Sequence, residues 1–103
     1  MEIETLKEIF GKYKKEEIFF TKHAELQAWI RGVDLEEVKK NIINPDKLVY
    51  AEEQESLKMG EKKYNCYFSY SKHLCHRYIL TLNRNILIVT IIKINRDWQK
   101  AIG

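Results

Sequence analysis

Histidines and a basic, aromatic C-terminal half supply the side chains that could do chemistry in this 103-residue sequence. His23, Gln27 and Arg31 are spaced at i, i+4 and i+8, so a helix would align them along one stripe. Histidine exchanges a proton near neutral pH, as general acid–base catalysis requires. A histidine in the first turn of a helix can instead bond a backbone carbonyl. His23 is therefore a candidate catalytic residue with a structural alternative.

Residues 62–78 interleave aromatic and cationic side chains. Rings stack on bases while Lys and Arg neutralise phosphate, so this composition is typical of nucleic-acid binding. Aromatic residues are also common in strands, where alternation turns half of them to the core. The candidate RNA-binding residues are Arg31, Lys62, Lys63, Tyr67, Lys72 and Arg84.

Metal-independent cleavage of RNA needs a base, a cation for the charge that develops on phosphate, and an acid for the leaving oxygen. We assign phosphate stabilisation to Arg77 and Lys93. The acid or base is His23 or His76, and Tyr78 orients or stacks the substrate.

Strand register decides which of these residues share a face. A three-residue turn over residues 83–85 would place Arg77 and Lys93 on one face, with His76 and Tyr78 on the other. A two-residue turn would move Lys93 to the face of His76 and Tyr78. The sequence leaves both alternatives open.

Metal and cofactor sites are only weakly indicated. Cys66, His73, Cys75 and His76 lack CxxC or HxxxH spacing, and neighbours on a strand point to opposite faces. No P-loop or dinucleotide motif occurs, and no base or oxyanion element accompanies either cysteine. We expect neither a metal nor a cofactor.

Composition and charge narrow the class of protein. A chain that is 45% hydrophobic and 32% charged is not disordered or low-complexity. The first 61 residues carry 10 Lys/Arg against 14 Asp/Glu, and the remainder carries 8 against 1. Such a basic half is typical of a site for an anionic partner such as nucleic acid, although pairing between the halves would also account for it.

The sequence also predicts the cellular compartment of the protein. The longest apolar run, residues 86–92, is too short to span a bilayer, and the acidic N-terminus lacks a signal-peptide pattern. Two cysteines without such a signal are typical of a reducing compartment. We expect a cytoplasmic protein without membrane contact.

The chain is predicted to be one domain over residues 1–103 that begins with helices. Residues 1–15 have an amphipathic period, and residues 16–20 favour an extended segment. A second helix over residues 22–31 follows Thr21 as N-cap and ends at Gly32, with Leu26 and Ile30 facing the core. A third helix has Asp34 as its N-cap, with Glu37 as capping-box partner, and stops at Asn44-Pro45.

The rest of the chain alternates with a period of two. Strands are predicted over residues 47–53, 62–70, 74–82 and 86–94, with a loop over 54–61 and a hairpin turn over 83–85. Residues 96–103 form a tail, with one helical turn at most, that Trp98 pins to the body. The fold class is α+β, with two or three helices packed on a three- to four-stranded antiparallel sheet.

Short motifs in this order resemble a family of small proteins of unknown function. The family has a His-Ala-x-x-Arg helix, an Arg-Gly-Ile/Val turn, a Glu-x-Val helix and then a proline before a strand meander that ends in a Val-Thr-type strand. The matching segments here are Thr21–Gln27, Arg31-Gly32-Val33, Leu35–Val38, Asn44-Pro45 and Ile88–Thr90.

This family is grouped with the RelE/ParE/BrnT-like toxin fold, and the resemblance covers residues 18–94. It implies two helices on a twisted antiparallel sheet and residues 18–94 as the core. Gln27 stands where the family usually has arginine, which removes one cation from the candidate groove.

The leading hypothesis is a small RNA-interacting protein of RelE-like fold. Its catalytic version is a metal-independent endoribonuclease toxin of a toxin–antitoxin pair, so the expected partners are RNA and an antitoxin-like protein. The alternative is a non-catalytic protein-interaction module with the same fold.

Overall fold

The computed structural model describes residues 2–102. Helices and strands follow one another in the order α1 (Ile3–Gly11), 3-10 turn η1 (Lys15–Glu17), β1 (Ile18–Phe20), α2 (Lys22–Arg31), α3 (Leu35–Ile43), β2 (Leu48–Gln54), β3 (Lys62–Ser71), β4 (Leu74–Leu82), β5 (Ile86–Ile94) and α4 (Gln99–Ile102). The α+β class is confirmed. Among the described residues, no helix has the length and apolar character needed to cross a membrane.

The sheet has five strands in the order β1-β5-β4-β3-β2. Strand β1 runs parallel to β5, whereas the other neighbours are antiparallel. The sequence predicted three or four antiparallel strands, and the difference is β1. This three-residue segment pairs Ile18 with Ile86, far along the chain, so the local pattern gave an extended segment but not its partner.

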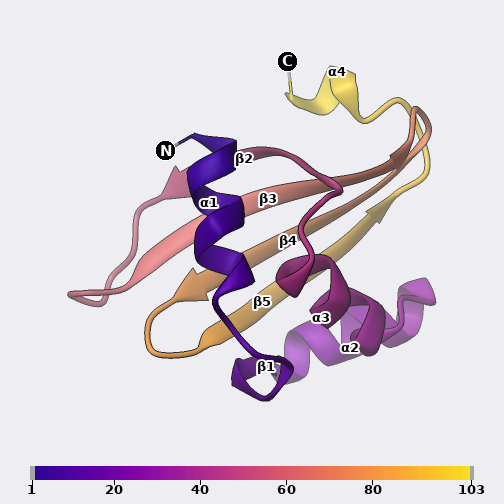
Figure 1. Cartoon of the computed structure of the whole chain (residues 1–103). Coiled ribbons are helices and arrows are strands. Elements are labelled where there is room, and N and C mark those ends of the chain that lie inside the picture. The colour runs from indigo at the N-terminus through magenta and orange to yellow at the C-terminus, as the bar shows by residue number, and fades with distance from the viewer. Residues whose placement is uncertain (1, 103) are drawn as a thin grey trace.

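One face of the sheet carries the helices and the main core. Figure 1 shows α1 and α3 in front of the sheet and α2 along its β5 side. Leu6 and Phe10 of α1 and Val38 and Ile42 of α3 are buried against strand residues of this face. The strand residues in that core are Leu48, Tyr64, Cys66, Phe68, Tyr78, Leu80, Leu82, Ile86, Ile88 and Ile91.

We call the opposite side of the sheet the helix-free face. Strand pairing assigns to it Tyr50, Glu52, Lys63, Asn65, Tyr67, Cys75, Arg77, Ile79, Thr81, Leu87 and Phe19. Trp98 covers one end of this face, where it packs with Tyr67 and Cys75 and donates its indole N–H to the Ser71 carbonyl at 2.7 Å. The predicted anchoring of the tail by Trp98 and its single helical turn are confirmed.

Helix α2 begins and ends as predicted, but its buried side is a different one. Thr21 Oγ1 accepts the Ala24 N–H at 3.0 Å, and Gly32 ends the helix at φ 67°. Leu26 and Ile30, predicted to face the core, are 56% and 66% exposed. The buried residues are Ala24 and Ala28, so the prediction for this face was wrong.

The close approach of α2 to β5 explains this reversal. Strand β1 pairs with β5 only as far as Ile88, so the edge of β5 beyond that point has free backbone groups. Helix α2 covers this edge: Thr21 Oγ1 donates to the Val89 carbonyl at 3.2 Å, and Gln27 Oε1 accepts the Ile91 N–H at 2.8 Å. Small alanines allow the helix to lie this close, while the larger residues point outward.

The other helices differ from prediction in detail. Helix α1 spans Ile3–Gly11, shorter than the predicted 1–15, and a 3-10 turn follows it. Asp34 caps α3 by accepting the Glu36 N–H at 2.9 Å, and α3 ends at Ile43, before Asn44-Pro45, as predicted. Glu37, predicted as a capping-box partner, instead accepts a hydrogen bond from Tyr70.

Candidate functional site

A β-bulge in β5 decides how the candidate catalytic residues are distributed. Leu82 pairs with Ile86 across a three-residue turn, which by itself would put Lys93 on the face of Arg77. The register shifts between Ile79 and Leu80, because Val89 is an extra residue in β5. Lys93 therefore pairs with His76, on the helix-covered face, while Arg77 lies on the helix-free face.

His76 and Tyr78 lie inside the molecule rather than at an open site. Their exposed fractions are 3% and 0%. Tyr78 Oη accepts a hydrogen bond from Asn41 Nδ2 at 2.9 Å and lies 2.7 Å from His76 Nδ1. Tyr78 has no other acceptor within reach among the described residues, so it donates its proton to Nδ1, and His76 is neutral with its proton on Nε2. Tyr78 cannot stack on a substrate.

Arg77 is the best positioned cation of the helix-free face. Its Nε donates to Asn65 Oδ1 at 2.6 Å, and Asn65 Nδ2 donates to Glu52 Oε1 at 3.0 Å. The guanidinium carbon lies 5.7 Å from the centre of the Tyr67 ring. The two terminal nitrogens of Arg77 have no hydrogen-bond partner in the described part of the chain, so a fixed guanidinium presents free donors.

Glu52 lies beside Arg77 because both side chains bond to the same amide. Glu52 is exposed, and Tyr50 Oη lies 3.4 Å from its Oε2. The Glu52 carboxylate raises the pKa of Tyr50, so Tyr50 keeps its proton and donates it to the carboxylate. A carboxylate and a guanidinium thus lie together on one open surface.

The end of the helix-free face that is formed by β1 and the turn between β4 and β5 carries a second set of exposed side chains. A hollow there is lined by Phe19, Thr81, Arg84 and Leu87, among others, and Phe19 is 51% exposed. Lys63 lines a neighbouring hollow together with Thr81 and Val89. The helix-free face therefore offers Arg77, Lys63 and Arg84 as cations and Phe19 as an exposed aromatic ring.

Tyr67 is on this face but is only 6% exposed. Tyr50 packs edge-on against its ring, with centroids 5.7 Å apart, and Trp98 belongs to the same cluster. The predicted role of Tyr67 as an RNA-stacking residue is not compatible with this burial. It packs against Arg77 and fixes its position instead.

The remaining candidates are scattered. His23 and Arg31 are exposed on α2, and Lys72 is exposed in the turn between β3 and β4. Lys62 is at the start of β3, where its Nζ lies 3.5 Å from Glu53 Oε2. The structure does not bring His23, His76, Arg77 and Lys93 into one site.

Four residues of the helix-free face were missed by the sequence reasoning: Tyr50, Glu52, Asn65 and Phe19. Once the register is known, the pairing of Glu52 with Asn65 and of Arg77 with Tyr67 shows the cluster directly. The available signal was alternation in β2, where Tyr50, Glu52 and Gln54 share one side.

A second polar cluster lies on the helix-covered face. Tyr70 Oη donates to Glu37 Oε2 at 2.5 Å and accepts from Asn41 Nδ2 at 2.8 Å. The Tyr70 ring lies 4.6 Å from the His76 ring, so this cluster continues to His76 and Tyr78. Burial, followed by the hydrogen bond to Glu37, raises the pKa of Tyr70 to about 12.

The cysteine and histidine side chains do not lie together in an arrangement that could bind a metal ion. Within residues 2–102, no group of three or more His, Cys, Asp or Glu side chains is arranged to hold a metal ion. Cys66 is buried on the helix-covered face and Cys75 on the other, and burial raises the pKa of both thiols. Neither thiol is therefore activated as a nucleophile.

Comparison with family models, with curated proteins and with solved structures gives no match for this chain.

Proposed function

We propose that the protein binds single-stranded RNA across the helix-free face of its sheet. The observation that supports this most is Arg77, a guanidinium fixed by Asn65 with its terminal donors free. Arginine in this state suits bidentate bonding to a phosphate. Lys63 and Arg84 add positive charge along the same face.

The exposed ring of Phe19 supplies the aromatic component of this surface. Base–aromatic stacking contributes about 1–3 kcal/mol per base and tolerates any sequence. Phe19 and Arg84 line the same hollow, so a stacked base would have a cation near its phosphate. This arrangement favours unpaired RNA, whose bases are free to stack.

The position of Glu52 near Arg77, with Asn65 hydrogen-bonded to both, supports cleavage of the bound RNA. Glu52 would take the proton of a ribose 2′-hydroxyl, whose oxygen then forms a bond to phosphorus. The bond from phosphorus to the 5′-oxygen breaks, and that oxygen takes a proton from water. Arg77 would stabilise the charge on the phosphate oxygens, so the reaction is a metal-independent endoribonuclease step.

The grouping with the RelE/ParE/BrnT-like toxin fold belongs to the same proposal, and the resemblance over residues 18–94 supports it. In this proposal Glu52 takes the acid–base role that the sequence suggested for His23 or His76, and Arg77 stabilises the phosphate without Lys93 or Tyr78. His76 and Tyr78 are buried, and Lys93 faces away from Arg77.

Binding is tested with a labelled single-stranded oligoribonucleotide in a salt titration. The association constant should fall steeply as salt increases, and Arg77→Gln should lower the affinity and reduce the slope by about one. Lys7→Gln on α1 is the matched control, because it removes one positive charge from the other side of the sheet and should change neither quantity by much. Equal effects of the two substitutions would contradict the proposal.

Cleavage is tested separately in the presence of a chelator. Glu52→Gln keeps an oxygen that accepts the Asn65 amide, so it should bind RNA normally but cleave about 10²–10⁴ times more slowly. RNA left intact by the native protein at high concentration would remove the catalytic part and leave the binding part standing.

A protein-interaction module is the second candidate function. Leu26, Trp29 and Ile30 form an apolar stripe on α2, and Trp29 is 83% exposed. Such a stripe suits an amphipathic helix of an antitoxin-like partner. Co-expression with the product of the adjacent gene should yield a complex that Trp29→Ala weakens; a complex that Trp29→Ala leaves intact would contradict this role of α2.

A further inference from the structure

The segment after β5, residues 95–100, crosses one end of the helix-free face and is attached there through Trp98. Figure 1 shows it running from the end of β5 past the turn between β3 and β4 and into α4. Trp98 is buried, whereas the neighbouring side chains of this segment are exposed or half-buried. We call residues 95–100 the strap.

Trp98 supplies the contacts that hold the strap to the sheet. Its indole N–H donates to the Ser71 carbonyl at 2.7 Å, and its ring packs with Tyr67 and Cys75. Among the described residues, no ion pair joins the strap to the rest of the chain. One side chain therefore fastens the strap, so a ligand that takes the place of one ring and one hydrogen bond releases it.

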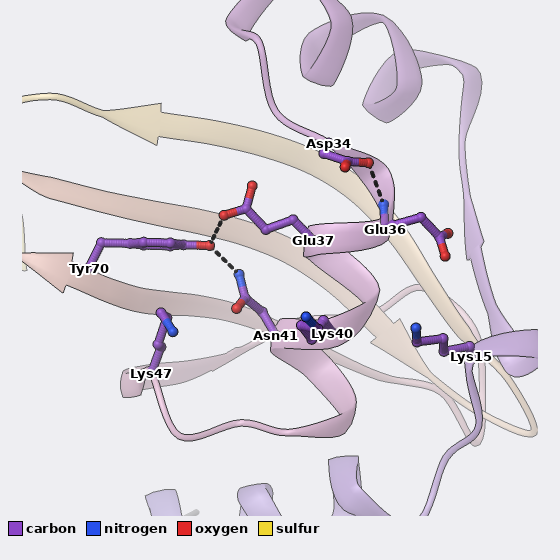
Figure 2. A pocket seen from close by; sticks show the side chains of 8 residues that line it. All are labelled: Lys15, Asp34, Glu36, Glu37, Lys40, Asn41, Lys47 and Tyr70. Carbon is purple, nitrogen blue, oxygen red and sulfur yellow. Dashed lines mark hydrogen bonds between the residues drawn. The ribbon is translucent and has the colours of Figure 1, made fainter.

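The strand end under Trp98 is fixed from the opposite face of the sheet. Tyr70, which precedes Ser71 in β3, donates to Glu37 Oε2 and accepts from Asn41 Nδ2. These bonds lie on the floor of a hollow between α3 and β3 that three lysines also line, as Figure 2 shows. Because this side of the contact is held in place, the strap is the part that can move.

Trp98 covers the sheet surface next to Arg77. Tyr67 is the cross-strand partner of Arg77, and Cys75 precedes Arg77 by two positions, so all three share the helix-free face. Tyr67 and Cys75 are 6% and 0% exposed. The Tyr67 ring centre lies 5.7 Å from the guanidinium carbon of Arg77. The indole thus occupies an apolar surface beside the cation that the proposed function assigns to phosphate.

A base attached to that phosphate would need this surface. Phe19, the exposed ring of the proposed function, lies at the other end of the face, where it lines a hollow with Arg84. A nucleotide whose phosphate binds Arg77 places its base near Tyr67 rather than near Phe19. While Trp98 is in place, Tyr67 is too buried to stack, so this end of the face accepts a phosphate but not a base.

We propose that the strap regulates RNA binding: Trp98 occupies the place of a base beside Arg77, and bound RNA displaces it. The inference rests on the proposed function, because it concerns the same face. An unpaired base can stack where the indole lay, since both are flat rings with apolar faces. Closed and open forms are then in equilibrium, and the apparent affinity for RNA is the affinity of the open form multiplied by the open fraction.

The first test follows Trp98 itself. The chain has two tryptophans, and Trp29→Phe leaves Trp98 as the only one. The native indole is 6% exposed, so its fluorescence emission should shift to longer wavelength when a single-stranded oligoribonucleotide releases it into water. The shift should saturate together with binding, measured from the anisotropy of labelled RNA. Emission that does not change while RNA binds would contradict displacement.

The second test releases the strap by substitution. Trp98→Ala should raise the affinity for the oligoribonucleotide about three- to tenfold, the factor expected when the open form is a minor fraction of the molecules. Trp98→Phe keeps an aromatic ring but loses the hydrogen bond to Ser71, so it should keep the fold and give a smaller gain. Gln99→Ala is the matched control, because Gln99 is an exposed residue of the same strap, and it should leave the affinity unchanged. Circular dichroism checks that each variant is folded.

The outcomes separate this inference from the proposed function. RNA binding by the native chain with no gain in either Trp98 variant would overturn the strap and leave the RNA surface standing. Weaker binding by folded Trp98→Ala would also overturn the strap, because Trp98 would then support Arg77 rather than cover a site for RNA. No binding by the native chain or by Trp98→Ala would overturn the proposed function, and the strap with it.

Discussion

His76 is the clearest case in which surroundings, rather than residue type, determine what a side chain does. Burial lowers the pKa of His76; the Glu37 carboxylate acts in the opposite direction, and Lys93 lowers the pKa again. The groups that face the ring are Tyr70 and Tyr78 on the same face, Glu37 on α3 and Lys93 on β5. A proton on Nδ1 would also take away the acceptor of the Tyr78 hydroxyl.

We predict that His76 makes the protein less stable in mild acid. In the unfolded chain a histidine has a pKa of about 6.5, whereas the pKa of His76 in the folded chain is lower, so the unfolded state binds more protons between the two values. The free energy of unfolding should therefore fall as pH decreases below about 6.5. Urea denaturation at neutral and mildly acidic pH measures this slope, and His76→Gln should flatten it. A variant with the native slope would contradict the assignment.

The residue types at the candidate sites were visible in the sequence, but their grouping was not. His76, Arg77, Tyr78 and Lys93 were all found, yet a bulge at Val89 leaves no mark in composition and changes which of them share a face. Glu52 was missed because an exposed acid on a short strand looks like ordinary surface until Asn65 and Arg77 are known to lie beside it.

At the scale of elements, α2 shows how packing can override hydropathy. Local signals located its ends at Thr21 and Gly32, because capping is a property of adjacent residues. The prediction of which face of α2 is buried was wrong, because it assumed that the larger apolar residues, Leu26 and Ile30, face the core. Helix α2 covers the open edge of β5 only if it lies close to that strand, and the small side chains of Ala24 and Ala28 permit this approach. Because β5 is distant from α2 in sequence, the local pattern did not reveal this contact.

Gln27 gives a prediction at this scale. Its Oε1 accepts the Ile91 N–H at the open edge of β5, so arginine, the residue expected there from the family pattern, would leave that N–H without an acceptor. We expect Gln27→Arg to lower the free energy of unfolding by about 1–3 kcal/mol and Gln27→Glu, which keeps an acceptor, to cost less. Chemical denaturation measures both; equal losses, or none, would show that the contact does not matter.

Two substitutions on the same helix, one exposed and one buried, show which face of α2 packs against the rest of the molecule. Trp29 is 83% exposed, so Trp29→Ala should change the free energy of unfolding by at most about 0.5 kcal/mol. Ala28 is 1% exposed against the core, so Ala28→Leu should cost about 1–3 kcal/mol through overpacking. The opposite order would mean that α2 packs as the sequence pattern first indicated.

Over the whole molecule, the sheet separates two kinds of polar surface. The helix-covered side holds the Glu37–Tyr70–Asn41 floor with its three lysines, and the helix-free side holds Arg77 with Glu52. The α+β class and the bounds of β4 and β5 were predictable from alternation and turn residues. The parallel strand β1 was not, because its partner is distant in sequence.

The basic excess of the C-terminal half is divided by this topology. Alternation along β3, β4 and β5 sends Lys63 and Arg77 to one face and Lys93 to the other, so a charge count over the sequence overstates what any one surface presents. The proposed RNA binding therefore depends on a fixed Arg77 and on the exposed Phe19 ring at the far end of the same face, rather than on total charge.

The most direct test of the proposed RNA-binding surface is an NMR titration of isotope-labelled protein with a short single-stranded oligoribonucleotide. We predict that the backbone amide signals of Phe19, Lys63, Arg77 and Arg84 shift together and saturate, and that Arg77→Gln weakens the response. Shifts confined to α1 and α3, or an unchanged spectrum, would contradict this prediction.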